Sequence, residues 1–166
     1  MENNTVTNAV VYYVIQKNDA ESRLLYFKDK NERDFRITPE TTPYRGHYET
    51  ASGYTANSGQ AKTYYVFRSY MEQLEYTGGG TITVAAGQYK LSHSVCIPSN
   101  VTVNFEDGVK IQKVKAVNTN LATNKTMFEL VPPSKEGVKN SVGGYNGSQN
   151  VTLQGNGSTI FDCAYT

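Results

Sequence analysis

The spacing of apolar side chains divides the chain into a strand-rich beginning, one helix and a long series of short strands. Residues 9–15 and 24–27 are β-branched and aromatic runs, which predict two strands joined as a hairpin. Residues 28–36 alternate charges of both signs, which is typical of a solvated surface. Residues 44–60 are rich in Gly, Ser, Thr and Tyr without clear periodicity. We therefore expect a loop or linker there and a domain boundary near residue 60.

Residues 63–76 carry the one convincing helical pattern. The apolar stripe follows the i, i+3, i+4, i+7 spacing and consists of Phe67, Tyr70, Met71 and Leu74. Thr63 is placed to cap the start of the helix, and Gly78 is placed to end it. The three glycines 78–80 follow a helix instead of a strand, so they predict a helix stop and a turn rather than a phosphate-binding loop.

After the glycines, the pattern changes to short strands separated by sharp turns. Residues 101–105 alternate apolar and polar positions, which predicts a strand with one buried face. Residues 100–103, a Gly turn and residues 109–111 recur as 150–153, a Gly turn and 159–161, at an offset of fifty residues (150 − 100). A coil of roughly two dozen residues that repeats with loop insertions is typical of a β-solenoid.

The repeat also predicts side-chain stacking. Asn100 and Asn150 would lie above one another as a ladder at a buried turn, with their amides hydrogen-bonded along the solenoid axis. Two irregular insertions, 115–125 and 132–146, separate the repeats, and residues 127–131 predict a strand between them.

Several motifs from residue 63 onward carry a family resemblance. An amphipathic helix precedes a Gly-rich lead-in, the strand–turn–strand T-I-T-V-x-x-G-x-Y-x-L follows, and the strand I-P-S-N-V-T-V is followed by a D-G-V turn. The later run N-V-T-L-x-G-x-G-S-T-I looks like a further coil. Residues 63–162 thus resemble the N-terminal coils of a right-handed parallel β-helix of the pectate-lyase-like superfamily. The chain lacks the Asp-Asp-Thr-x-Ala-Ile-Gln type of helix with which many members begin.

This resemblance implies a fold more specifically than an activity. It implies that the helix covers the first coil and shields its open edge. Members include polysaccharide lyases, glycoside hydrolases, phage tailspikes and surface proteins. The lyases use an Arg or Lys and often calcium, whereas the hydrolases use two or three Asp on neighbouring coils. Because both sites usually lie in central coils, we expect the catalytic residues outside this chain.

Length and charge exclude several classes of protein. The 166 residues suffice for one domain with a core, and 16 Lys+Arg against 15 Asp+Glu give a net charge of +1 that does not favour nucleic acid. No apolar run approaches the ~20 residues of a membrane span. Residues 1–8 lack the features of a signal peptide, so either the protein is cytosolic or the sequence is a piece of a longer exported chain. Residues 161–166 follow a strand without a closing element, which favours the second alternative and a secreted or cell-surface location.

Asp162 is the single catalytic candidate among the carboxylates of the repeats. These carboxylates, which lie far apart in the sequence, are Glu106, Asp107, Glu129, Glu136 and Asp162. Glu106 and Asp107 stand at a Gly turn, where acidic residues are common for local reasons. Asp162 ends a strand and would belong to a cleft completed by further coils, although a structural role is the stronger interpretation. We expect no cofactor and no metal site, with calcium bound only if residues beyond this chain contribute ligands.

The histidines and cysteines give weaker signals. His47 and His93 have no neighbouring ligand in the sequence, and we expect both to be surface residues. No Gly-x-Ser-x-Gly motif is present to support a Ser nucleophile. Cys96 lies in an apolar run, which predicts a buried and inert thiol. A disulfide between Cys96 and Cys163 stays open as the less favoured alternative.

A lysine-rich stretch is the candidate for ligand binding. Residues 109–140 hold a local excess of +4 (6 Lys − 2 Glu), from Lys110, Lys113, Lys115, Lys125, Lys135 and Lys139. A lysine-rich wall that includes Lys113 and Lys115 would suit an anionic polysaccharide. Tyr145 would stack on a sugar ring and Asn146 would hydrogen-bond its hydroxyls. The alternatives are a solvated loop, which we favour for the lysines, and a tight turn with a packed Tyr145.

Taken together, the sequence predicts a mainly β chain. Residues 1–60 would form a strand-rich extension with a loop, and residues 61–166 would form a capping helix and the first coils of a right-handed parallel β-helix. We expect the N-terminal part of a secreted or surface bacterial protein that acts on carbohydrate as a polysaccharide lyase or glycoside hydrolase, and that is inactive as this piece alone. The alternative is a non-catalytic glycan-binding or structural solenoid, as in adhesins or tailspikes. The expected partners are an anionic polysaccharide and, through the open solenoid end, a second copy.

Overall fold

The structure is a computed structural model that describes residues 11–16, 22–27, 31–55, 61–115, 126–141 and 146–164. Among the described residues, strands hold more of the chain than helices do. These are β1 (Val11–Gln16), β2 (Ser22–Phe27), β3 (Asp34–Ile37), β4 (Gly80–Val84), β5 (Gly87–Leu91), β6 (Val95–Cys96), β7 (Val101–Glu106), β8 (Val109–Lys113), β9 (Phe128–Glu129), β10 (Thr152–Asn156) and β11 (Thr159–Asp162). The helices are α2 (Ser52–Thr55), α3 (Lys62–Thr77) and the 3₁₀ turns η1 (Tyr44–Gly46) and η2 (Pro133–Lys135).

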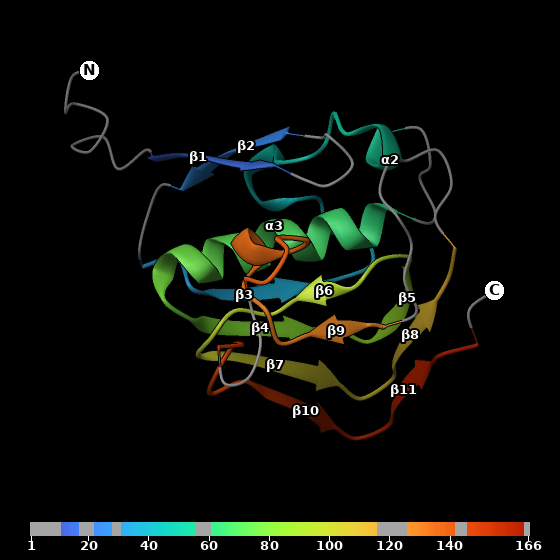
Figure 1. The fold of residues 1–166 in the computed structure, drawn as a ribbon. Helices are drawn as coiled ribbons and strands as arrows, with labels where there is room; N and C mark the ends of the chain where they lie inside the picture. The colour runs from blue at the N-terminus through green and yellow to red at the C-terminus, as the bar shows by residue number, and fades with distance from the viewer. Residues whose placement is uncertain are drawn as a thin grey trace, which may run out of the picture.

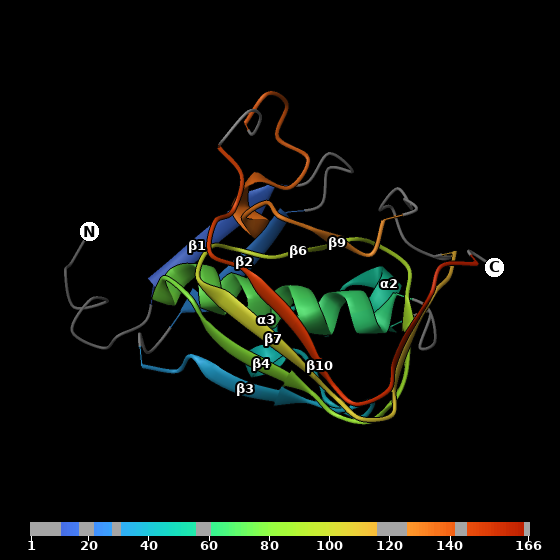
Figure 2. The ribbon, with the colours of Figure 1, turned by 90° about the horizontal axis from the view of Figure 1, so that it is seen from below.

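From β4 onward the chain passes repeatedly through the same three sheets. The sheets have the strand orders β10-β7-β4-β3, β11-β8-β5 and β6-β9, and every pair within them is parallel. Figure 1 shows the strands of successive passes stacked, and Figure 2 shows the three sheets enclosing a common interior. The prediction of a mainly β chain built from parallel strands is confirmed, and this arrangement is compatible with a solenoid.

The fifty-residue offset is the actual pairing register. Thr152 lies beside Thr102 and Phe161 beside Ile111. The alternation in β7 places Val101, Val103 and Phe105 inward, and all three are buried. The asparagine ladder also forms, because Asn150 Nδ2 donates to Asn100 Oδ1 at 3.0 Å. Both side chains are exposed, so the ladder orders a surface corner and not, as predicted, a buried turn.

Helix α3 covers the interior at the first coil. Its predicted stripe packs inward, with Phe67, Met71 and Leu74 buried against the sheets, and the helix contacts β4, β5 and β6. Gly78 ends the helix in a left-handed conformation with φ of 79°, as predicted. The predicted Thr63 cap is wrong: the helix begins one residue earlier, and its N-cap is Ala61 without a side-chain hydrogen bond.

The N-terminal region is more ordered than its composition indicates. β1 and β2 pair antiparallel, which confirms the hairpin. Arg33, Asp34 and Arg36 are exposed, in agreement with the solvated surface predicted for residues 28–36. The prediction did not include β3, which pairs parallel with β4 and adds a strand to the main sheet. The loop predicted after it contains η1 and α2, and Tyr44 and Tyr48 are buried.

The structure describes more of the second insertion than of the first. Residues 116–125 of the first lie outside the described residues. The strand predicted at 127–131 shortens to β9, and the second insertion contains η2. We call residues 132–141 the insertion segment.

Among the described residues, no helix combines the length and apolar character needed to cross a bilayer.

Candidate functional site

The outward face of the β5–β8–β11 sheet gathers polar and charged side chains in register. Tyr89 and Ile111 alternate into the interior and are buried, so their neighbours point outward. Pairing places Gln88 beside Lys110 and then Ile160, and Lys90 beside Gln112 and then Asp162. We call Gln88, Lys90, Lys110, Gln112 and Asp162 the lysine face.

The charges of the lysine face are open to solvent. Lys110 Nζ lies 3.5 Å from Asp162 Oδ2, and the two side chains are 42% and 27% exposed. Such an exposed pair binds weakly, so Lys110 is available to another anion. With Lys90 the face carries a net charge of +1 (2 Lys − 1 Asp). Its ammonium and amide groups suit carboxylates and hydroxyls as ligands.

Asp162, the predicted catalytic candidate, is engaged by groups other than carboxylates. One oxygen faces Lys110, and Oδ1 accepts the backbone N–H of Ala164 at 3.2 Å. The turn carboxylates are engaged elsewhere: Glu106 binds Arg36, which lowers the pKa of Glu106, and Asp107 Oδ1 accepts from the backbone N–H of Ser158. These contacts do not make the paired carboxylates that glycoside hydrolysis needs.

The predicted binding residues lie apart from one another. Lys113 does not belong to an exposed lysine-rich wall, as predicted, but ends β8 inside the molecule with 0% of its surface exposed. Its Nζ donates to the carbonyl of Thr126 at 2.6 Å, and burial lowers the pKa of Lys113 to about 8 against the opposing effect of nearby Glu129. Lys115 is exposed just beyond β8, and Asn146 is exposed in the second insertion. Tyr145 lies outside the described residues.

The interior is open at the third coil. A cavity of about 490 Å³ there is lined by Phe105, Thr126, Met127, Phe128, Leu153, Gly155, Thr159, Phe161 and Cys163. Its aromatic side chains pack edge to face, with the ring centroids of Phe105 and Phe161 5.2 Å apart. The lining is mainly apolar, so it suits an apolar occupant better than a sugar.

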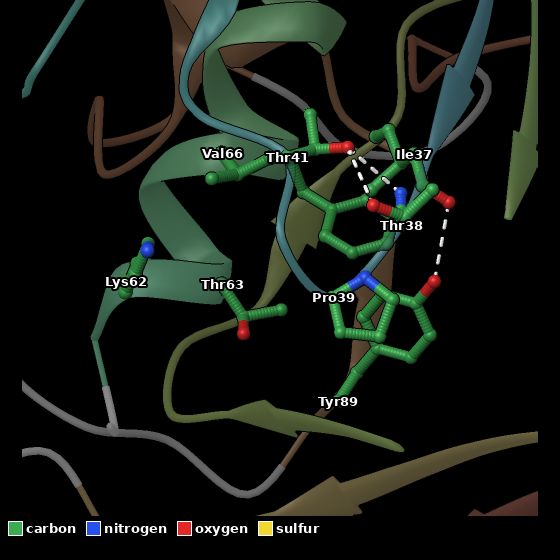
Figure 3. Close-up of a pocket in the computed structure, with 9 residues that line it drawn as sticks. Ile37, Thr38, Pro39, Thr41, Lys62, Thr63, Val66 and Tyr89 are labelled. Carbon is green, nitrogen blue, oxygen red and sulfur yellow. Dashed lines mark hydrogen bonds between the residues drawn. The ribbon is translucent and has the colours of Figure 1, made fainter. Parts of the chain in front are cut away.

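A second pocket lies where α3 begins beside β3 (Figure 3). Thr38 and Thr41 hydrogen-bond to one another there, and the Tyr89 hydroxyl donates to the carbonyl of Ile37 at 3.1 Å. Its volume of about 10 Å³ is close to the space that one water needs, so it is no substrate site.

A buried polar network lies on α3. Arg68 Nε donates to Glu72 Oε1 at 2.6 Å and to the Tyr48 hydroxyl at 3.0 Å, and Arg68 also pairs with Glu136. The Tyr64 hydroxyl donates to Glu136 at 3.1 Å. The network therefore joins the loop before α3, the helix and the insertion segment. Because the network is buried, it stabilises the packing of these segments and is not a site for ligand binding.

The histidines are buried, which corrects the expectation that they lie at the surface. Burial, aided by the charge of Arg45, lowers the pKa of His47 to about 4. His93 Nδ1 lies 2.8 Å from Ser92 Oγ, inside the molecule.

Cys96 is buried, as predicted, and Cys96 and Cys163 are both free thiols rather than a disulfide. Within the described ranges, no group of three or more His, Cys, Asp or Glu is placed to hold a metal ion.

Sequence reasoning missed Lys90, Gln112 and the Arg68 network. The alternation of residues 88–91 contains the signal for an outward Lys90.

Comparisons with family models, with curated proteins and with solved structures found no match for the chain.

Proposed function

We propose that the chain forms the capped first coils of a right-handed parallel β-helix in a secreted or surface carbohydrate-active protein, and that its lysine face binds an anionic polysaccharide. The parallel three-sheet stack and the helix over its first coil support the β-helix assignment. The contacts of Asp162, Glu106 and Asp107 favour binding over catalysis by the described residues.

The distribution of charge over the two larger sheets carries this proposal. On the outward face of the β3–β4–β7–β10 sheet, Arg36 and Glu106 form a 3.0 Å ion pair, and Thr102, Asn104 and Gln154 are uncharged. The lysine face has two cations against one anion, with Gln88 beside Lys110 and Gln112 between Lys90 and Asp162. A chain of uronate residues offers both carboxylates for the lysines and hydroxyls for the amides.

Affinity measurements with polygalacturonate and a neutral glucan test the proposal. The chain should bind polygalacturonate more tightly, and added salt should weaken that binding because exposed charges are screened. Lys110→Gln should weaken binding, whereas Asp162→Asn should strengthen it, because Asp162 competes with the ligand for Lys110. Arg33→Gln, which removes an exposed cation elsewhere, is the matched control.

Two results would contradict the proposal. One is equal affinity for polygalacturonate and the neutral glucan. The other is the same small effect of Lys110→Gln and Arg33→Gln. A loss of binding in Asp162→Asn would instead assign Asp162 a direct role toward the ligand.

A structural solenoid without glycan binding is the second candidate function. The observation that favours it is the set of structural contacts made by Asp107, Glu106 and Asp162. Absence of binding to any polysaccharide tested, by a folded chain, would support this candidate.

A further inference from the structure

Two copies of the tripeptide Asn-Gly-Ser lie in different surroundings. They are residues 146–148 and residues 156–158, and they contain the two Asn-Gly pairs of the sequence. Asparagine is a thermolabile residue, because the backbone nitrogen that follows it can attack its side-chain carbonyl carbon. Glycine favours this attack, since it has no Cβ to hinder the approach. How firmly the fold holds each pair therefore decides which of the two reacts.

The first pair is loosely held. Asn146 is exposed near the end of the second insertion, and neither Asn146 nor Gly147 hydrogen-bonds to another residue within the described ranges. The next residue is held, because the N–H of Ser148 donates to the carbonyl of Leu130 at 2.9 Å. The bond that must rotate for the attack joins Cα and C of Asn146, so it lies before this hydrogen bond.

The second pair is firmly held. Asn156 is the last residue of β10, which pairs with β7. The N–H of Ser158 donates to Asp107 Oδ1 at 2.7 Å, and the carbonyl of Ser158 accepts the N–H of Gly108 at 2.8 Å. Gly157 has a φ of 113° and packs so closely that a Cβ there would lie 2.7 Å from Asp107 Cγ. Rotation at Asn156 would disturb these contacts, so its amide is protected although Asn156 is also exposed.

We infer that Asn146 is a site of spontaneous deamidation, with water as the second reactant. The nitrogen of Gly147 bonds to Cγ of Asn146, and the side-chain nitrogen leaves as ammonia with the proton of the Gly147 N–H. The product is a five-membered succinimide ring. Water then adds to either carbonyl of the ring and breaks its C–N bond, which leaves aspartate or isoaspartate.

The reaction changes the charge of the chain and needs no ligand. It turns a neutral amide into a carboxylate, so each event lowers the net charge from +1 to 0 (+1 − 1). The inference stands apart from the proposed glycan binding, because it concerns the chemistry of the second insertion and not the lysine face.

Peptide mapping by mass spectrometry tests the inference on the folded 166-residue chain after incubation in mildly alkaline buffer. We expect aspartate and isoaspartate at position 146, and conversion at position 156 that is slower by about tenfold or more, since the hydrogen bonds of Ser158 must open first. In guanidinium chloride the two rates should become similar. Asn146→Gln should abolish the conversion at position 146, because glutamine would have to close a larger ring, and should leave the rate at position 156 unchanged.

Three results would overturn the inference. The first is conversion in the folded chain that is as fast at position 156 as at position 146, or faster. The second is an unchanged Asn146 in the folded chain, because the fold would then protect both pairs. The third is aspartate without isoaspartate at position 146, which would indicate direct hydrolysis of the amide instead of a succinimide.

Discussion

Arg68→Met is expected to lower the free energy of unfolding by about 3–5 kcal/mol, because it removes one partner from a buried ion-pair network. Arg68 is 3% exposed and contacts Glu72 through Nε at 2.6 Å. Glu72 is also buried, and Glu136 is the second carboxylate that Arg68 contacts. Met fills much of the volume of Arg68 without its charge, so the buried Glu72 and the partly exposed Glu136 both lose this cation while Glu72 keeps its cost of burial.

The loss has a local signature as well as a global one. Arg68 and Tyr64 both contact Glu136, and Glu75 Oε2 accepts the backbone N–H of Ser134 at 3.0 Å. We therefore expect Arg68→Met to speed hydrogen exchange in the insertion segment more than in β7. Arg68→Lys should recover only part of the stability, because one ammonium cannot reproduce the geometry of the guanidinium.

Urea unfolding with linear extrapolation measures the global effect. Arg36→Met is the matched control, since Arg36 also pairs with a glutamate but is exposed, and it should leave the free energy of unfolding almost unchanged. Adding Glu72→Gln and Glu136→Gln to Arg68→Met should restore part of the loss, because the buried charges are then gone. A loss below about 1 kcal/mol for Arg68→Met, or no recovery in the triple variant, would refute the electrostatic explanation.

Three further outcomes are expected. Leu74→Ala should cost about 2–5 kcal/mol in urea unfolding, since Leu74 is fully buried under the first coil, and a cost below about 0.5 kcal/mol would count against α3 as a cap. The folded pKa of His47, about 4, lies below its unfolded value of about 6.5, so the stability that neutral His47 contributes to the fold is fully present above pH 6.5 and is lost as the pH falls toward 4. The melting temperature measured from pH 4 to 7 should therefore depend less steeply on pH in His47→Gln than in the unchanged chain. Identical slopes would contradict this. The chain alone should release neither unsaturated products nor reducing ends from polygalacturonate, xylan or neutral glucans, and turnover that follows the purified protein would disprove this.

The sequence predicted those features that depend on local alternation and on repetition. Residues 101–105 alternate strictly, and the fifty-residue offset equals the register of β10 against β7. The helix was predictable because its apolar stripe and its Gly78 stop lie within one short segment.

The features that were missed depend on partners far away in the sequence. Strand β3 has only four residues, with charges at alternate positions, and it is a strand because β4 offers an edge to it. Lys113 continues the inward positions of Val109 and Ile111, but its charge suggested a surface role. Arg68 and Glu72 have the spacing of an exposed helical pair, but both are buried, and Arg68 contacts Glu136 and Tyr48, which lie far away in the sequence.

Amide chemical-shift mapping with an oligogalacturonate shows whether the lysine face holds an anionic polysaccharide. We expect the largest shifts on β5, β8 and β11, around Lys90, Lys110 and Asp162, and only small shifts on β3 and β4. Shifts that concentrate on the insertion segment or on β3 and β4, or no shifts at a saturating concentration of the oligosaccharide, would contradict it.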